Sequence, residues 1–405
     1  MSTDQLLFAA AVIMAVTAAA IGVARRLNLG SIAALLAVGM ILGPHSPMPL
    51  FTNRLGDLQA LGEIGVMLLI FVVGLDTQPR RLWSMRVLVF GFASIEYVAT
   101  SVALGGFLLL VSHVNWQSAL VLGLGLAMSS SAVPFPILEA RNEAGSSYGR
   151  VTIAADIFQA LMVIPVLALI PLLGSVLGSS GEAIHTFNAI QICAALIAVF
   201  LLGHIVLPYA LKAVAPNVGS AAFALVVLSG VFAAAWIVER AGVSMALGAF
   251  LMGVLLSTSI YAKAVKDAVT PARRVLLGVF FVAVGMAIDL KEAAAFRAEL
   301  LFYITAVLLI KSALVYGIAR AFRLDRSAAL LSGLLLMPLD EIGYVIFASA
   351  HQHGLLTERA YALALLSIST SFLVSPIAIN LGFRWAPTLT PRCDTPAPRD
   401  NQFLT

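Results

Sequence analysis

The sequence predicts an all-α polytopic membrane protein with about 13 transmembrane helices arranged as inverted repeats. The first observation is composition: 61% of the 405 residues are hydrophobic and 11% are charged, whereas about a quarter of the residues in a soluble domain are charged. The second is the length of the apolar stretches, commonly 17 to 25 residues, which suits about 30 Å of hydrocarbon. The third is the distribution of basic residues between these stretches.

Apolar length, Gly and Pro positions and charged breaks place the individual helices. The N-terminal stretch lacks the basic residues of a cleavable signal peptide, so its apolar run is expected to be a retained helix. Cys193 and Cys393 lie too far apart to suggest a disulfide framework or a metal cluster. The predicted helices span residues 5–23, 31–43, 59–74, 87–111, 117–138, 151–177, 188–211, 220–238, 242–257, 274–290, 299–321, 326–352 and 358–384.

The basic residues predict how the chain is oriented in the membrane. With the N-terminus outside, 18 of the 24 Lys and Arg residues fall on the cytoplasmic side and five on the other side, while Lys311 lies within a span. Cytoplasmic loops are enriched in Lys and Arg, so we expect a multi-pass protein of the plasma (inner) membrane with its C-terminus in the cytoplasm. The basic residues form no patch with interleaved aromatics, so nucleic acid is not an expected partner.

Thirteen helices divide into two sets of six joined by a linking helix, with the second set upside down relative to the first. Inverted repeats of this kind are typical of secondary transporters. The fifth and twelfth helices correspond, and each apolar pattern is interrupted near mid-membrane, which predicts two broken, crossing helices with free ends for an ion. Two ordinary proline kinks are the alternative. The residues at the breaks are Ser129, Ser130, Ser131 and Pro134 in the fifth helix and Pro338 in the twelfth.

Five ionisable residues lie within predicted spans, namely Glu96, Asp156, Lys311, Asp340 and Glu341. A charge at the bilayer centre costs at least about 2.5 kcal/mol, so each is expected to have a partner or a task. A salt bridge of Lys311 with Glu96 or Asp156 would reduce that cost. Two alternatives assign no transport role: the pairs merely hold helices together, or Asp156 is an acid favoured by the dipole near its helix start.

Several stretches of the chain resemble one known family. The segments "GEIGVMLLIFVVGLDTQPRRLW", "LAMSSSAVPFPILEARNEAGSSYGR" and "LLGVFFVAVGMAIDL", with others between residues 22 and 384, are similar to the membrane domain of the monovalent cation:proton antiporter-2 family, which includes the Kef-type potassium efflux systems. The resemblance implies a sodium/proton-antiporter-like fold, a homodimer, and a six-helix core that moves like an elevator. It also implies that protons compete with Na⁺ or K⁺ at a carboxylate on the sixth helix, and it places the family's basic residue of the eleventh helix at Lys311.

The sixth helix departs from the family pattern at the ion-carrying acid. Family members have Phe-Gln-Asp followed by Ile-Pro, whereas this chain has Phe-Gln-Ala, with Gln159 and Ala160 at the last two positions. Alanine offers a cation no oxygen and a proton no site. Asp156 lies one turn earlier on the same helix face, about 6 Å nearer the cytoplasm. We therefore expect Asp156 to replace the missing acid, with Gln159 beside it.

Other departures add acids to the same region. Glu341 matches the family acid of the twelfth helix, whereas Asp340 and Pro338 are additions and Glu96 stands where a neutral residue is expected. The leading prediction is a proton-coupled secondary transporter, most simply exchanging Na⁺ or K⁺ for H⁺, with Asp156 as proton carrier and Glu96 or Asp340 assisting. The alternatives are transport of a divalent, organic or anionic substrate, and a non-transporting membrane protein derived from an antiporter. The sequence carries no recognisable enzyme or metal-site motif.

The predicted domain organisation is simple. Residues 1–386 are expected to form the transmembrane domain, with core helices at about 87–177 and 299–384 and the remainder serving dimerisation and scaffolding. Residues 387–405 have the composition of a short disordered cytoplasmic tail. No Gly-rich motif follows a predicted strand, so neither a nucleotide-binding regulatory domain nor a cofactor is expected.

Overall fold

The computed structural model describes residues 31–43, 55–77, 83–112, 114–177, 189–214, 221–241, 244–287 and 297–389, with isolated positions before residue 31. The predicted helix at 5–23, apart from those positions, and residues 390–405 of the predicted tail lie outside the described residues. Within the described residues the regular structure is helical, apart from one isolated β-bridge.

The described helices follow one another along the whole chain. Two of them, η1 and η2, are π-helical segments within longer helices. In chain order the elements are α2 (Ser31–Leu42), α3 (Leu55–Asp76), η1 (Leu88–Ala93), α5 (Ser94–Ser112), α6 (Trp116–Ala127), α7 (Pro134–Ala140), α8 (Ser147–Leu177), α9 (Ala189–Leu201), η2 (Leu202–Val206), α10 (Leu207–Val214), α11 (Ala221–Arg240), α12 (Met245–Ser257), α13 (Ala262–Ala287), α15 (Arg297–Ala321), α16 (Arg326–Leu335), α17 (Ile342–Gln352) and α18 (Glu358–Leu389).

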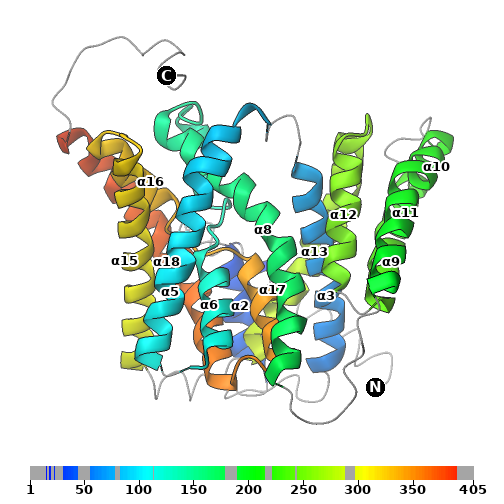
Figure 1. Ribbon diagram of the computed structural model, residues 1–405, viewed down its shortest axis with the longest axis horizontal. Helices are drawn as coiled ribbons and strands as arrows, with labels where there is room; N and C mark the ends of the chain where they lie inside the picture. Colours follow the sequence, from blue (N-terminus) through cyan, green and yellow to red (C-terminus); the bar gives the residue numbers. More distant parts are fainter. Residues whose placement is uncertain are drawn as a thin grey trace.

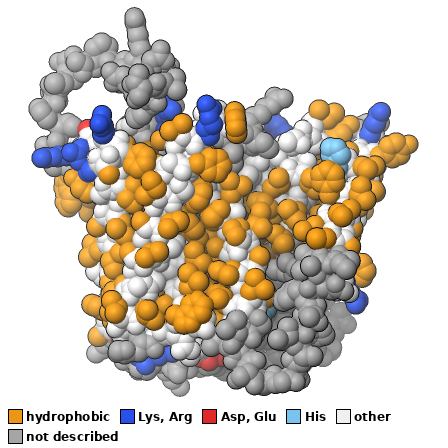
Figure 2. All heavy atoms as spheres, in the orientation of Figure 1, with side chains coloured by type: hydrophobic (Ala, Val, Ile, Leu, Met, Phe, Trp, Pro, Cys, Tyr) orange, Lys and Arg blue, Asp and Glu red, His pale blue; other side chains and the backbone are white. Residues whose placement is uncertain are grey.

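The helices form the apolar belt of a multi-pass membrane protein. Among the described residues, seven helices are long and apolar enough to cross a bilayer, and four further apolar helices are shorter. Figure 2 shows hydrophobic side chains over most of the face in view, with Lys and Arg side chains mainly along its upper edge. Such a belt is stable only in lipid, because water would meet a continuous apolar surface.

The helices pack in two groups, and Figure 1 shows α11 and α12 of one group at the right and α5 and α15 of the other at the left. In the first, which we call the α13 group, α13 packs against α2 and α3, and α12 packs against α3 and α11. In the second, the broken-helix group, α5 packs against α6 and α15, while α17 packs against α18, α6 and α8. Phe281 of α13 and Tyr344 of α17 join the groups, with ring centroids 5.3 Å apart.

Small residues bring helix backbones into direct contact within the α13 group. Gly253 of α12 lies against the Phe71 carbonyl of α3, and Gly74 of α3 lies against the Phe250 carbonyl of α12. A Cβ atom at either glycine would collide with the facing carbonyl oxygen. In lipid, where apolar surfaces gain little by meeting each other, close backbone packing of this kind holds helices together.

The two predicted breaks are present, and local residues explain them. The helix predicted over 117–138 consists of α6 and α7, separated where Met128 adopts extended dihedrals, φ −63° and ψ 140°, and Pro134 opens α7. The helix predicted over 326–352 consists of α16 and α17, and Pro338 stands between them. Proline disfavours a helical conformation in the preceding residue and donates no N–H, so it ends a helix more readily than it continues one.

Two predicted boundaries were wrong. The helix predicted over 274–290 begins at Ala262, because α13 continues through Pro271 and through a basic stretch that includes Lys266. Lys and Ala are strong helix formers, so a charged stretch can extend a span beyond the hydrocarbon as helix. The helix predicted over 358–384 ends later, since α18 continues to Leu389.

Candidate ion and proton site

The site is built where the two broken helices cross. Ser129, after α6, and Leu339, after α16, form an antiparallel β-bridge. The Ser130 N–H donates to the Pro338 carbonyl at 3.1 Å, and the Ser129 hydroxyl donates to the Leu336 carbonyl at 2.8 Å. These bonds pair backbone groups that the helix breaks leave open in a region without bulk water. The crossing is therefore a closed, hydrogen-bonded joint and not two independent kinks.

A chain of buried polar groups runs from this joint to Glu96. The Ser129 N–H donates to Gln159 Oε1 at 2.7 Å, and Gln159 Nε2 donates to Glu96 Oε2 at 3.2 Å. Thr100 Oγ1 donates to Glu96 Oε1 at 3.3 Å. Glu96 is fully buried and Gln159 is 2% exposed. The Glu96 carboxyl thus has a hydrogen-bond donor on each oxygen, and Gln159 ties α8 to both the joint and α5.

Lys311 lies at the C-terminal end of α6. Its side chain is fully buried, and Nζ donates to the Met128 carbonyl at 2.5 Å and to the Leu126 carbonyl at 3.2 Å. A helix C-terminus carries partial negative charge and unpaired carbonyls, so the ammonium compensates both. The charges of Glu96 and Asp340 also act on Lys311. Lys311 and Glu96 do not form a contact ion pair among the described residues.

Three further carboxylates near the joint are half-buried. Asp340 Oδ1 accepts from the Ile342 N–H at 3.0 Å and so caps the start of α17, where the helix dipole favours negative charge. Glu341 Oε2 accepts from the Ser130 hydroxyl at 2.9 Å. The charge of Asp156, on α8, acts on Asp340. Asp156, Asp340 and Glu341 form what we call the acid group.

The remaining predicted site residues take backbone roles or lack a polar group. The Ser131 carbonyl accepts from the Phe135 N–H at 3.1 Å in the first turn of α7. Pro134 starts that helix and is buried. Ala160, half-buried on α8, has only a methyl group to offer. The structure therefore leaves the position of the family's acid without oxygen, one turn from Asp156.

Sequence reasoning missed several residues that support the site. Thr100 stands four residues after Glu96, so helical spacing alone could have paired them. The Ser371 hydroxyl accepts from the Leu339 N–H at 3.1 Å, and the hydroxyls of Tyr344 and Ser369 are 2.9 Å apart. Those contacts join residues 25 or more positions apart and left no local signal.

A cavity of about 350 Å³ lies between the two groups, toward the C-terminal end of α17. Met67, Met245 and Phe280 line it from the α13 group, while Val345 and His353 line it from α17. The Phe280 and Tyr344 rings, with centroids 6.5 Å apart, meet beside it. Tyr344 follows Glu341 by about one helical turn.

Crossing broken helices with a buried ammonium and several carboxylates near the crossing are typical of one class of protein, the secondary transporters. Within that class the assignment is direct. The chain belongs to the family described as sodium/hydrogen exchanger, transmembrane, whose sequence pattern matches residues 11–385. This is a family of transporters and not of enzymes, and the resemblance seen in the sequence is confirmed.

Curated relatives and solved structures agree with the family. The chain is 34% identical over 375 residues to the glutathione-regulated potassium-efflux system protein KefC of Enterobacter sp. (strain 638), covering 93% of this chain and 60% of that protein. It is 34% identical over 357 residues to KefC of Escherichia coli (strain K12), covering 88% and 57%. It thus spans about 60% of the length of these relatives. The sodium proton antiporter MjNhaP1 from Methanocaldococcus jannaschii at pH 8 shares the fold, with a TM-score of 0.66, 17% identity, and 95% and 98% of the two chains covered.

Proposed function

We propose that the protein exchanges a monovalent cation, Na⁺ or K⁺, for protons, and that the acid group binds both. The observation that carries this proposal is the grouping of Asp156, Asp340 and Glu341 near the crossing: each is partly accessible to solvent, and the charges of Asp156 and Glu341 both act on Asp340. Carboxylates that share one region compete for the same positive charge. A cation or a proton can supply that charge, and this competition is the basis of exchange.

The fully buried side of the joint has a different task in this proposal. Glu96 accepts hydrogen bonds from Gln159 and Thr100, and Lys311 is bound by two carbonyls. Their hydrogen bonds hold the half-helices in place. We assign them to positioning the joint, and assign ion and proton exchange to the acid group, with Asp156 in place of the acid that Ala160 lacks.

The proposed mechanism uses the two packing groups. The broken-helix group carries the acid group, and a cavity lies between the two groups. We propose that the chain has 13 transmembrane helices in inverted repeats and moves the broken-helix group against the α13 group as an elevator. We further propose a homodimer formed through the α13 group, in the plasma (inner) membrane, with the N-terminus outside and the C-terminus in the cytoplasm.

Potassium is the first cation to test, because the similar curated proteins are named as potassium-efflux systems. The alternative of an anionic substrate has less support. An anion would need the Lys311 charge, and that ammonium is buried against the Met128 and Leu126 carbonyls. The three half-buried charges at the crossing are negative and suit a cation.

Exchange is tested in proteoliposomes that hold a pH-sensitive dye and a preset proton gradient. Addition of KCl or NaCl is expected to dissipate the gradient with the wild-type protein, and Asp156→Asn is expected to lower the rate at least about tenfold, because it removes one carboxylate from the acid group. Glu139→Gln, an exposed acid at the end of α7, is the matched control and should exchange normally. If K⁺, Na⁺, Li⁺ and Rb⁺ all fail to dissipate the proton gradient, monovalent cation exchange is refuted. If Asp156→Asn exchanges at the wild-type rate, Asp156 has a structural role.

A further inference from the structure

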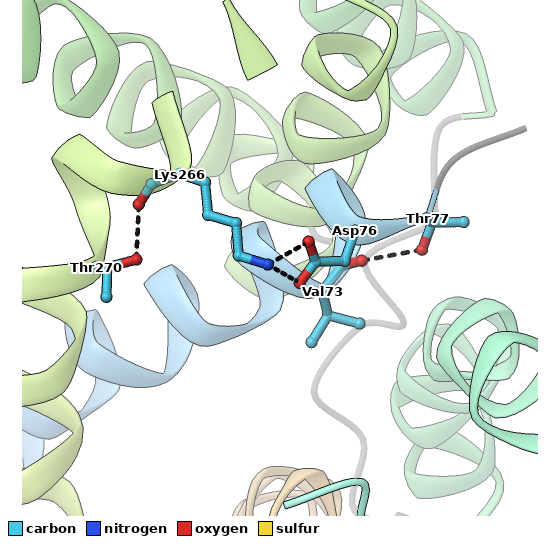
Figure 3. A network of polar contacts seen from close by, with 5 residues as sticks. All are labelled: Val73, Asp76, Thr77, Lys266 and Thr270. Atoms are coloured by element: carbon cyan, nitrogen blue, oxygen red, sulfur yellow. Dashed lines mark hydrogen bonds and ion pairs between the residues drawn. The ribbon is translucent and has the colours of Figure 1, made fainter. Parts of the chain in front are cut away.

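One face of α13 carries a line of polar and basic residues toward the acid group. Lys266, Thr270 and Arg273 are spaced by four and three residues, so they share a helix face. Lys266 Nζ lies 2.6 and 2.8 Å from the two carboxylate oxygens of Asp76 on α3, as Figure 3 shows. Thr270 donates its hydroxyl to the Lys266 carbonyl at 2.6 Å. The cytoplasmic part of this face is thus fastened to α3.

Arg273 lies on the same face of α13, but within the described part of the chain its Nε atom has no hydrogen-bond partner of the kind that Lys266 has in Asp76. Its side chain is partly buried, and its Nε atom is fully buried with no hydrogen-bond partner among the described residues. A buried donor without an acceptor is unfavourable and rare in native structures. Of the charges that act on Arg273, Glu341 attracts it most strongly, Asp76 attracts it less, and Arg274 repels it. Asp76 already binds Lys266 with both oxygens, so Glu341 is the carboxylate left for Arg273.

The packing of α13 against α17 explains this proximity independently. The Phe280 and Tyr344 rings meet at 6.5 Å. Arg273 precedes Phe280 by seven residues, about 10.5 Å of helix, and Glu341 precedes Tyr344 by three, about 4.5 Å. In the proposed topology both helices run in the same direction, so Arg273 and Glu341 differ by about 6 Å in position along the helix axes, an offset that a long arginine side chain can span.

We propose that Arg273, a cationic residue of the α13 group, faces Glu341 in this conformation. The two side chains must then separate when a transported cation binds to the acid group. Arg273 is a positioning residue in this inference, which rests on the proposed exchange function. Glu341 belongs to the broken-helix group and Arg273 to the α13 group, so movement of one group against the other changes their separation. The fixed charge then favours the cation-free acid group and weakens cation binding in this conformation.

Kinetics provide the first test. Arg273→Gln is expected to lower the KM for K⁺ or Na⁺ by about two- to fivefold, the range for one partly exposed charge pair, because the competing charge is gone. Arg273→Lys keeps the charge and should stay near wild type. Arg274→Gln, which removes the same charge from the exposed neighbouring position, is the matched control. An unchanged or raised KM in Arg273→Gln, or an equal fall in Arg274→Gln, would overturn the inference.

Unfolding of the purified protein in detergent provides a test that needs no transport. Arg273→Gln, Glu341→Gln and the double variant are melted with and without K⁺. If the residues interact, Glu341→Gln lowers Tm less in the Arg273→Gln background than in wild type, and the K⁺-dependent rise in Tm is larger in Arg273→Gln than in wild type. Additive Tm changes refute the pairing whether or not transport occurs. Coupled Tm changes in a protein that exchanges no monovalent cation would instead refute the proposed function and leave the pairing standing.

Discussion

At the scale of single residues, Gln159 has the contacts that join three helical segments. Its amide accepts from the Ser129 N–H and donates to Glu96, so both ends of one side chain are used in a buried region. Glutamine suits this place because it carries a donor and an acceptor without charge. A second carboxylate at this position would face Glu96 directly. Gln159 is thus a neutral residue that hydrogen-bonds to both the joint and Glu96.

We expect Gln159→Leu to destabilise the protein by about 2 to 4 kcal/mol, because it leaves the Ser129 N–H and one Glu96 oxygen without partners in a buried region. Thermal unfolding in detergent measures the change. Thr152→Val on the same helix is the control, since it removes only a local bond to the Tyr148 carbonyl. Equal losses in the two variants would show that Gln159 has no special part in the joint.

At the scale of elements, the half-helices require charges at their open ends. The α6 end faces the Lys311 ammonium, and the α17 start carries Asp340 and Glu341. Positive charge at a helix C-terminus and negative charge at an N-terminus both interact favourably with the helix dipole. Each half-helix therefore ends inside the membrane next to the sign of charge that stabilises it. The same arrangement leaves the acids beside a helix start where a cation must compete with backbone N–H groups.

Replacing Lys311 tests this arrangement. Lys311→Met keeps most of the length of the side chain and removes the charge, so the Leu126 and Met128 carbonyls lose their donor and Glu96 loses a nearby positive charge. We expect a loss of about 3 to 5 kcal/mol in unfolding free energy. Adding Glu96→Gln should recover part of that loss, since the buried carboxylate no longer needs compensation. A double variant less stable than Lys311→Met would show that the Glu96 charge is compensated elsewhere.

At the scale of the whole molecule, the protein is a helical membrane domain with an asymmetric distribution of charge. Lys and Arg side chains lie mainly along one edge of the hydrophobic belt in Figure 2. In the proposed orientation Arg323 and Arg326 lie on the cytoplasmic side of the membrane, and Arg240 lies on the opposite side. The same orientation makes the 350 Å³ cavity beside the Tyr344 ring open to the outside.

Labelling of single cysteines tests this orientation. With Cys193 and Cys393 replaced by Ser, Arg240→Cys is expected to react with a membrane-impermeant maleimide in right-side-out vesicles. Arg323→Cys is expected to react only in inside-out vesicles, because cytoplasmic loops retain Lys and Arg. Reaction of both residues from one side, or the reverse pattern, would contradict the proposed topology.

The elements that sequence reasoning placed best were those with a local cause. Apolar stretches and proline positions predicted the break between α6 and α7 and the break between α16 and α17. The start of α13 was placed wrongly because charge was taken as the end of a span, although Lys-containing segments are good helices. For the site, the sequence supplied candidate residues, but it did not predict the hydrogen bonds that these residues form in the structure.

Sequence by itself determined that this chain lies in a bilayer, where its helices break, and which family it belongs to, because length, hydropathy and proline are properties of contiguous residues. Only the tertiary structure decided which polar groups meet. Gln159 and Glu96 are 63 positions apart, and Lys311 and Met128 are 183 apart. Such contacts depend on the packing of distant helices, and in lipid a buried polar group takes whichever partner that packing brings within reach.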